Sequence, residues 1–148
     1  MGEVREVLRV VEEVVVEAPI ERVFRALSSP GEVPLWWRAE GQYETTAAEI
    51  DLRPGGRYRL SGTSERLGTF EVGGTYLVVD PPTRLVFTWR PDWDEDARNS
   101  KVEIHLEEVS AGTRVRVTHT GFATTDARDG HAGGWPNVLH RLSIHVEA

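Results

Sequence analysis

The segment that decides the fold is the last part of the chain, residues 131–148, which reads HAGGWPNVLHRLSIHVEA. Its apolar residues recur at positions i, i+3, i+4, i+7 and i+11, the stripe of an amphipathic helix. They are Trp135, Val138, Leu139, Leu142 and Val146. Pro136 suits a first helical turn. The chain before this helix reads as strands, so we expect the stripe to lie against a sheet, with either solid core or a pocket between them.

The predicted strands are recognised by alternating apolar and polar residues. They cover residues 7–16, 47–52, 57–62, 69–79, 84–90 and 101–109, and a last strand runs from 114 to 119. The tetrad 53–56 suits a type II turn, because its third residue, Gly55, can adopt the positive φ that this turn needs. Gly73 and Gly74 predict a bulge that bends the sheet. The segments 91–99 and 121–130 are expected to be rim loops.

Two short helices are predicted after the first strand. Pro19 opens the first, in which Ile20, Val23, Phe24 and Leu27 have amphipathic spacing. The second is a turn over residues 33–37. Consecutive hairpins with helices near the start and at the end indicate an α+β fold, in which an antiparallel sheet is covered on one face. A doubly wound fold is disfavoured, because strands and helices do not alternate and no glycine-rich nucleotide motif occurs.

Composition narrows the possible functions. The chain has 148 residues and a net charge of -7, so we expect one domain over 1–148 and no nucleic-acid partner. There is no cysteine, which excludes disulfides and thiolate metal sites. The charged N-terminus is unlike a signal peptide and no apolar run is long enough to span a membrane, so a cytoplasmic location is expected.

Several stretches of the sequence resemble one known family. They are residues 18–28, 35–37, 51–58, 79–89, 112–113, 118–121 and 134–135, which read APIERVFRALS, LWW, DLRPGGRY, VDPPTRLVFTW, GT, THTG and GW. These stretches resemble the homologues of the activator of heat-shock-protein-90 ATPase, within the START-like (SRPBCC) superfamily. The resemblance implies a helix-grip fold, in which a curved antiparallel sheet packs around a long C-terminal helix and an apolar cavity.

The resemblance leaves the function open. Members of the superfamily include lipid and hormone carriers and polyketide cyclases and aromatases. The co-chaperone that gives the family its name has a further N-terminal domain, which we do not expect in a chain of 148 residues.

The candidate ligand-binding residues are mostly aromatic, because indole and phenyl rings between a sheet and a helix can line an apolar pocket. Trp37 and Trp89 are the strongest candidates for lining a pocket, since each lies at the end of a predicted helix or strand, near a loop. The alternative for every one of these residues is ordinary core packing. The candidates are Trp37, Tyr58, Phe87, Trp89, His119, Phe122, Trp135, Leu139 and Leu142.

His119 is the most informative titratable residue. Strand alternation places it on the inner face, where a neutral imidazole can bind a ligand oxygen or act as acid or base near pH 7. The alternative is a core histidine whose nitrogens are satisfied by backbone or by a tryptophan. Metal binding is not expected, because His131, His140 and His145 are spaced by nine and five residues and do not stack on a helix. No cofactor is expected.

Three functions follow from these observations. The first is non-catalytic binding of a small hydrophobic or aromatic molecule between the C-terminal helix and the sheet. The second is a cyclase-, aromatase- or hydrolase-like enzyme with His119 as general acid or base. The third is a protein-interaction module, either chaperone-associated or a homodimer, which predicts a filled interior and an exposed apolar patch.

Overall fold

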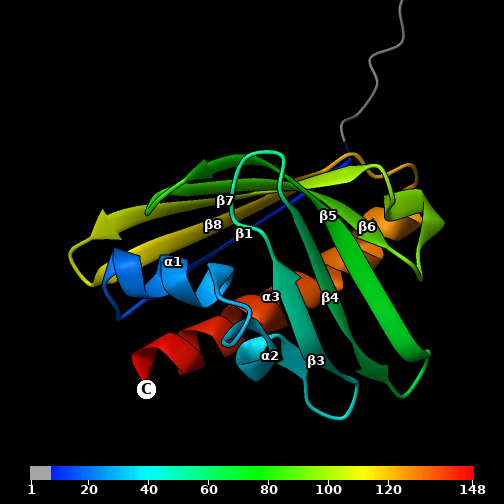
Figure 1. Ribbon diagram of the computed structural model, residues 1–148, viewed down its shortest axis with the longest axis horizontal. Coiled ribbons are helices and arrows are strands. Elements are labelled where there is room, and N and C mark those ends of the chain that lie inside the picture. Colours follow the sequence, from blue (N-terminus) through cyan, green and yellow to red (C-terminus); the bar gives the residue numbers. More distant parts are fainter. Residues whose placement is uncertain (1–7) are drawn as a thin grey trace, which may run out of the picture.

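A single antiparallel sheet of eight strands forms the frame of the molecule, in the order β1-β8-β7-β6-β5-β4-β3-β2. The computed structural model describes residues 8–148 (Figure 1). The strands are β1 (Arg9–Val16), β2 (Arg38–Ala39), β3 (Tyr43–Ile50), β4 (Arg57–Ser64), β5 (Gly68–Asp80), β6 (Arg84–Pro91), β7 (Ser100–Val109) and β8 (Gly112–Thr120). Each predicted strand is present, and residue 7 of the first prediction lies outside the described residues.

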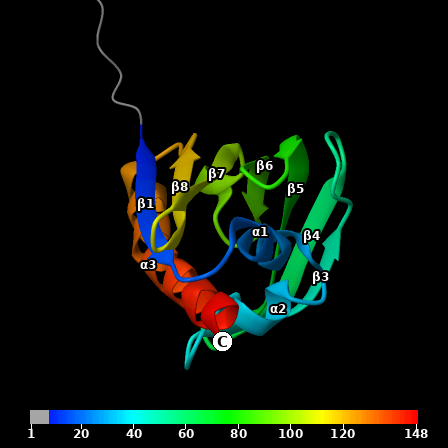
Figure 2. The ribbon, with the colours of Figure 1, turned by 90° about the vertical axis from the view of Figure 1, so that its left-hand side faces the viewer.

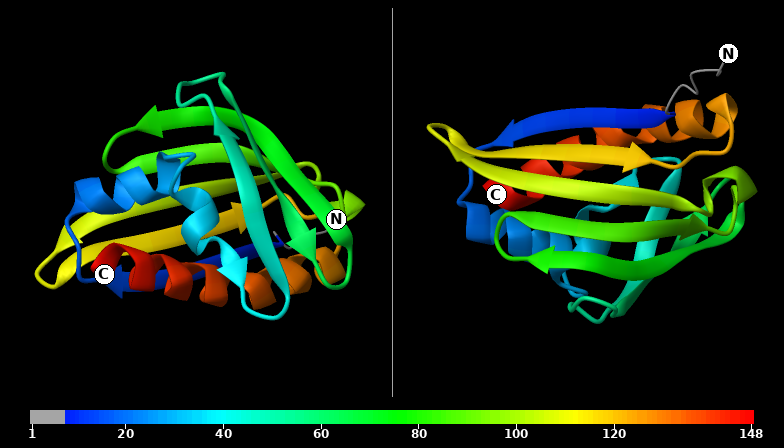
Figure 3. Two further views of the ribbon diagram at one scale, coloured as in Figure 1. Left: turned by 60° about the horizontal axis from the view of Figure 1, so that its bottom comes forward. Right: turned by 90° about the horizontal axis from the view of Figure 1, so that it is seen from above.

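Three α-helices occupy one side of this sheet. They are α1 (Ile20–Ser28), α2 (Val33–Trp36) and α3 (Thr125–Glu147), and a short 3-10 helix, η1 (Glu95–Ala97), follows β6. Figure 2 shows the sheet curled into a U whose open side is closed by α1, α2 and α3. The right-hand view of Figure 3 shows the outer face of the sheet, with the helices behind it, and the left-hand view shows the helices in front. The predicted α+β helix-grip fold is therefore confirmed.

Strand alternation places the core where the sequence predicts it. On β7, Val102, Ile104 and Leu106 are buried, while on β8 Val115 and Val117 face the same interior. The intervening residues of these strands point outward and form cross-strand ion pairs. Such pairs join Arg114 to Glu13 and Glu107, each at 3.2 Å.

The long helix α3 begins earlier than its apolar stripe suggests. The prediction of a loop over 121–130 is wrong from Thr125 onward, because Thr124 caps the helix and its side chain accepts a hydrogen bond from the Ala127 amide at 3.1 Å. Pro136 consequently lies inside the helix and not in its first turn. The stripe itself is confirmed, since Trp135, Leu142 and its other members are buried.

The glycines of the hairpins have two different roles. Gly55 has a φ of 82°, as the predicted turn requires. The predicted bulge at Gly73 and Gly74 is wrong, because β4 and β5 pair without a shift there and the β5–β6 register shifts between Tyr76 and Val78. A Cβ on Gly74 would come within 2.1 Å of the Thr88 carbonyl oxygen, so this glycine permits a close approach of β6.

Among residues 8–148, no helix combines the length and apolar character needed to cross a membrane. Within the same part of the chain, no group of three or more His, Asp or Glu side chains is arranged to hold a metal ion.

Candidate functional site

A small aromatic-lined cavity lies between the α1–α2 segment and the concave face of the sheet. We call it the aromatic cavity. It is lined by Leu27, Val33, Trp37, Ile50, Tyr58, Leu60, Tyr76, Phe87, Trp89 and Ile104. Its volume is about 20 Å³, close to the space of one water molecule. The interior is thus packed nearly solid, and the residual space is surrounded by rings.

Trp37 forms one edge of this cavity. Its ring stacks on Trp36 with centroids 5.2 Å apart and on Trp89 with centroids 5.8 Å apart. Trp36 is 1% exposed and its indole N–H donates to the Ala26 carbonyl at 3.0 Å, which anchors it. Trp37 follows the last residue of α2 and is only partly buried. The Trp37 ring also meets the Trp135 ring edge-on, with centroids 5.8 Å apart, so contacts with three other indoles hold it over the cavity.

Two tyrosines supply the polar atoms of the cavity wall. The Tyr58 hydroxyl donates to the Thr88 carbonyl at 2.6 Å, whereas the Tyr76 hydroxyl forms no hydrogen bond with the described residues. Burial, together with the neighbouring Tyr76, raises the pKa of Tyr58 well above its ordinary value. Burial likewise raises the pKa of Tyr76. Both phenols stay neutral at physiological pH, and that of Tyr76 is free to bond a polar group in the cavity.

Polar contacts hold the start of α2, as the hydrogen bond of Trp36 holds its end. The Glu32 carboxylate accepts a hydrogen bond from Arg22 of α1 at 2.7 Å and pairs with His145 of α3 at 2.8 Å. Partial burial acts to raise the pKa of Glu32, but hydrogen bonds from His145 and Arg22 and their charges outweigh it, and the pKa is lowered. One end of the α2 segment is therefore tied to both neighbouring helices.

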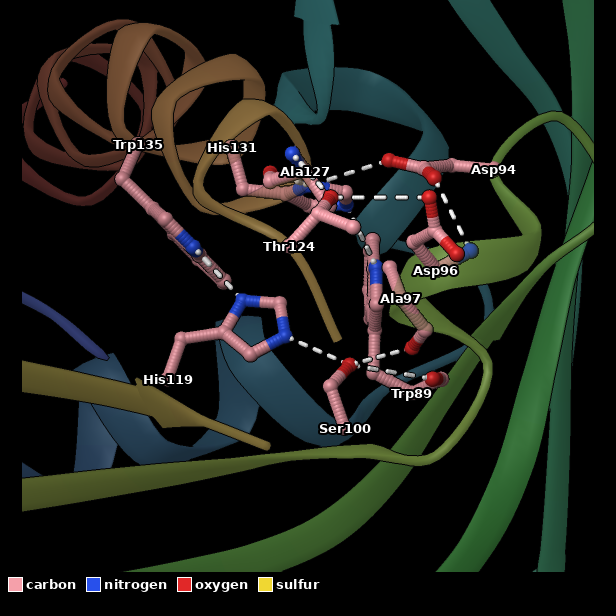
Figure 4. A network of polar contacts seen from close by, with 10 residues as sticks. All are labelled: Trp89, Asp94, Asp96, Ala97, Ser100, His119, Thr124, Ala127, His131 and Trp135. Atoms are coloured by element: carbon pink, nitrogen blue, oxygen red, sulfur yellow. Dashed lines mark hydrogen bonds and ion pairs between the residues drawn. The ribbon is translucent and has the colours of Figure 1, made fainter. Parts of the chain in front are cut away.

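His119 lies outside this cavity, in a closed hydrogen-bond network (Figure 4). The Trp135 indole N–H donates to His119 Nδ1 at 3.1 Å, so Nε2 carries the proton and donates to Ser100 Oγ at 2.8 Å. Ser100 in turn donates to the Ala97 carbonyl at 2.6 Å. His119 is 0% exposed, and burial, followed by the charge of His131, lowers its pKa to about 3. The imidazole is neutral and both of its nitrogens are satisfied.

A second tryptophan–histidine bond runs in the opposite direction. The Trp89 indole N–H, on β6, donates to His131 Nε2 at 3.1 Å, and His131 Nδ1 donates to the Ala127 carbonyl at 2.9 Å. Trp135 of α3 thus donates a hydrogen bond to β8, and His131 of α3 accepts one from Trp89 of β6 (Figure 4). We call these bonds, with Ser100, the Trp–His network. His131 was considered above only as a metal ligand, although its spacing of four from Trp135 places both on one helix face.

The structure separates the candidate residues into two groups. Trp37, Tyr58, Phe87 and Trp89 line the aromatic cavity. The remaining candidates are buried but do not line it, and they are His119, Phe122, Trp135, Leu139 and Leu142. No lining residue belongs to α3, so this cavity does not lie beneath that helix, where the sequence predicts it. The large side chains of its stripe fill the space where the cavity was expected.

The sequence analysis also missed part of the wall. Tyr76 lies on β5 with the same inward orientation as Tyr58 and Phe87, and the three rings contact one another with centroids 5.2 to 6.0 Å apart. Strand alternation indicates that Tyr76 is buried, but the pairing of β5 with both β4 and β6 is what brings these rings together. Leu27 and Val33 join them because α1 and α2 cover this end of the sheet.

Known proteins share this fold. The family model for Activator of Hsp90 ATPase homolog 1-like protein matches residues 17–147. A crystal structure from Chromobacterium violaceum has 29% identity and a TM-score of 0.83, covering 95% of this chain and 98% of its own. The AHSA1-like protein from Aeromonas hydrophila has 27% identity and a TM-score of 0.78, covering 94% of this chain and 92% of its own. No curated protein matches the chain.

The family match extends from the residue after β1 to the last residue of α3. It therefore includes both the aromatic cavity and the Trp–His network. The START-like fold is consistent with ligand binding. This chain belongs to the family of Activator of Hsp90 ATPase homolog 1-like proteins.

Proposed function

We propose that this protein binds a small hydrophobic or aromatic molecule in the aromatic cavity, without catalysis. The observation that carries the proposal is a wall of five aromatic rings around residual space, with one hydroxyl, that of Tyr76, that no described residue bonds. An apolar pocket with few polar groups is the usual form of a small-molecule site. The Tyr76 hydroxyl favours a ligand that combines a ring with a hydroxyl or carbonyl group.

Binding requires the cavity to enlarge. A space of about 20 Å³ holds one water, whereas a benzene-sized ligand needs roughly 150 Å³. We propose that the Trp37 ring swings outward, because it follows the last residue of α2 and is only partly buried. Loss of its ring contacts with Trp36, Trp89 and Trp135 costs about 1 kcal/mol each. Burial of about 200 Å² of ligand surface contributes about 5 kcal/mol, which outweighs that loss.

The absence of catalysis is proposed from the state of His119. An acid–base mechanism at this residue needs a nitrogen that reaches the substrate and titrates near neutral pH. In the structure Trp135 and Ser100 occupy both nitrogens, and burial, followed by the charge of His131, lowers the pKa of His119 to about 3. His119 therefore fits the interpretation of a satisfied core histidine.

The experiment is a binding screen with three related ring compounds, namely toluene, p-cresol and indole. Titrations followed by calorimetry are expected to show binding, with p-cresol tighter than toluene because it can bond Tyr76. Ile104→Phe adds a ring to the cavity wall and is expected to abolish binding. Leu106→Phe is the matched control on the same strand, since Leu106 does not line the cavity. Equal binding to both variants, or no binding by any compound, would refute the proposal.

We also propose that residues 1–148 act as one domain in the cytoplasm. A homodimer or a chaperone contact remains a prediction. Light scattering at several protein concentrations tests the former, and a pull-down with the purified chaperone tests the latter.

A further inference from the structure

A second hollow lies on the surface, where the β2–β3 turn and the end of β4 meet α3. We call it the polar cleft. Its volume is about 520 Å³, within the usual range for small-molecule sites. Its charged lining residues are Arg38, Glu40, Glu44, Glu65 and Arg141. None of them lines the aromatic cavity, so an inference about this cleft is independent of the function proposed above.

The guanidinium of Arg38 is incompletely satisfied. Its Nη2 donates to the Pro34 carbonyl at 3.2 Å, but Nη1 lies 3.7 Å from the Glu44 carboxylate, beyond hydrogen-bond distance. Its Nε is buried and has no partner, and among residues 8–148 it is the one buried side-chain nitrogen or oxygen in that state. The Arg38 side chain as a whole is 36% exposed, so an oxyanion in the cleft can supply the acceptor that Nη1 lacks.

Arg141 brings a second guanidinium to the same cleft. Asn137 Nδ2 donates to the Arg38 carbonyl at 3.0 Å, which fixes this part of α3 against β2. Arg141 lies four residues further along α3 and therefore on the same helix face. It lines the cleft, and no described residue forms an ion pair with it. Two arginines thus line one cleft with N–H donors to spare.

Three carboxylates line the same cleft, and that of Glu44 is the nearest to Arg38. Glu44 is 53% exposed at its side chain, and Glu40 and Glu65 are also exposed. Three carboxylates beside two guanidinium groups, in a chain with a net charge of -7, disfavour a polyanion. A ligand with one carboxylate and one hydrogen-bond donor matches both kinds of group, since the arginines take the former and the glutamates the latter.

We propose that the polar cleft binds a small carboxylic acid that also carries an ammonium or hydroxyl group. The carboxylate lies between Arg38 and Arg141, and the donor group faces Glu44 and Glu65. The juxtaposition of Arg38, whose Nη1 has no acceptor within hydrogen-bond distance, with a second arginine in one cleft carries this assignment.

The experiment is an NMR titration with four probes of equal chain length, namely γ-aminobutyrate, γ-hydroxybutyrate, butyrate and butylammonium. The Nε–H signals of Arg38 and Arg141 and the Gly41 amide signal report on the cleft. We expect γ-aminobutyrate and γ-hydroxybutyrate to shift these signals and butyrate to bind several-fold more weakly. Butylammonium is expected to leave them unchanged, because it lacks the carboxylate.

Arg141→Gln is the decisive variant, because Arg141 lacks the Pro34 contact through which a change at Arg38 could disturb the fold. It is expected to weaken γ-aminobutyrate binding about tenfold. Arg57→Gln, at an exposed arginine of β4 outside the cleft, is the matched control and should bind as the wild type does. The proposal is overturned if no probe shifts the signals at roughly 20 mM. It is also overturned if both variants bind alike, or if butylammonium binds as tightly as γ-aminobutyrate.

Discussion

The two ends of the interior differ in how their aromatic rings are held. Where the first half of α3 meets the sheet, Trp135 and Trp89 each donate an indole N–H to a histidine on the other side. Where α2 meets the sheet, Trp37 is held over the aromatic cavity by stacking. Directed hydrogen bonds fix one arrangement of a core, whereas stacking tolerates several. We infer that the first region is the rigid support and the second is the part that opens.

The largest loss of stability is expected when His119, at the centre of the rigid region, is removed. His119→Ala leaves a cavity and deprives both Trp135 and Ser100 of a partner, so it should lower the free energy of unfolding by about 4 kcal/mol. Urea unfolding measures this loss. A loss below about 1 kcal/mol would mean that the Trp–His network contributes little to stability.

Acidification should weaken the same region. Burial, followed by the charge of His131, lowers the pKa of His119 to about 3, while the unfolded value is near 6.5, so the unfolded chain binds the proton more readily. The contribution of His119 to stability is therefore complete above pH 6.5 and is lost as the pH falls toward 3. Between pH 7.5 and 4.5 the loss amounts to about 2 to 3 kcal/mol.

The variant His119→Gln separates the pH dependence of stability that His119 causes from the pH dependence that the carboxylates cause, because glutamine does not titrate. Unfolding free energies of both proteins across the pH range are compared. The difference between wild type and variant should shrink with acidification, and a constant difference would contradict the assigned state of His119.

A matched pair of substitutions compares the two regions directly. Trp135→Phe keeps a ring but leaves His119 Nδ1 unpaired, so it should cost about 2 kcal/mol. Trp37→Phe keeps a ring at a partly buried position that stacking holds, and should cost less than about 1 kcal/mol. Thermal unfolding measures the loss of stability in each variant. Equal losses would show that the region around Trp135 is not held more rigidly than the region around Trp37.

The smallest effect on stability is expected at Tyr76. Tyr76→Phe removes a hydroxyl that bonds no described residue, so stability should change by no more than about 0.5 kcal/mol. The affinity for p-cresol should fall to that for toluene, because the proposed hydrogen bond is lost. Tyr58→Phe is the control, since its hydroxyl already bonds Thr88. An unchanged preference for p-cresol in Tyr76→Phe would place the polar contact elsewhere.

Local sequence patterns predicted the strands and helices better than they predicted the aromatic cavity and the partners of His119. The alternation of Val115, Val117 and His119 and the stripe of α3 follow from local periodicity, and both are confirmed. The start of α3 was missed because its first residues carry no apolar stripe, and it depends on the Thr124 cap. The position of the cavity depends on how α2 lies across β3 to β7, which no local pattern encodes. The partners of His119 are similarly set by tertiary packing.

The central claim is that the ligand enters beneath Trp37 and not beneath α3. Intermolecular nuclear Overhauser effects from bound p-cresol test it most directly. We predict contacts to Trp37, Tyr76 and Ile104. Contacts to Leu139 and Leu142 without them, or a bound ligand that contacts only surface residues, would contradict the account.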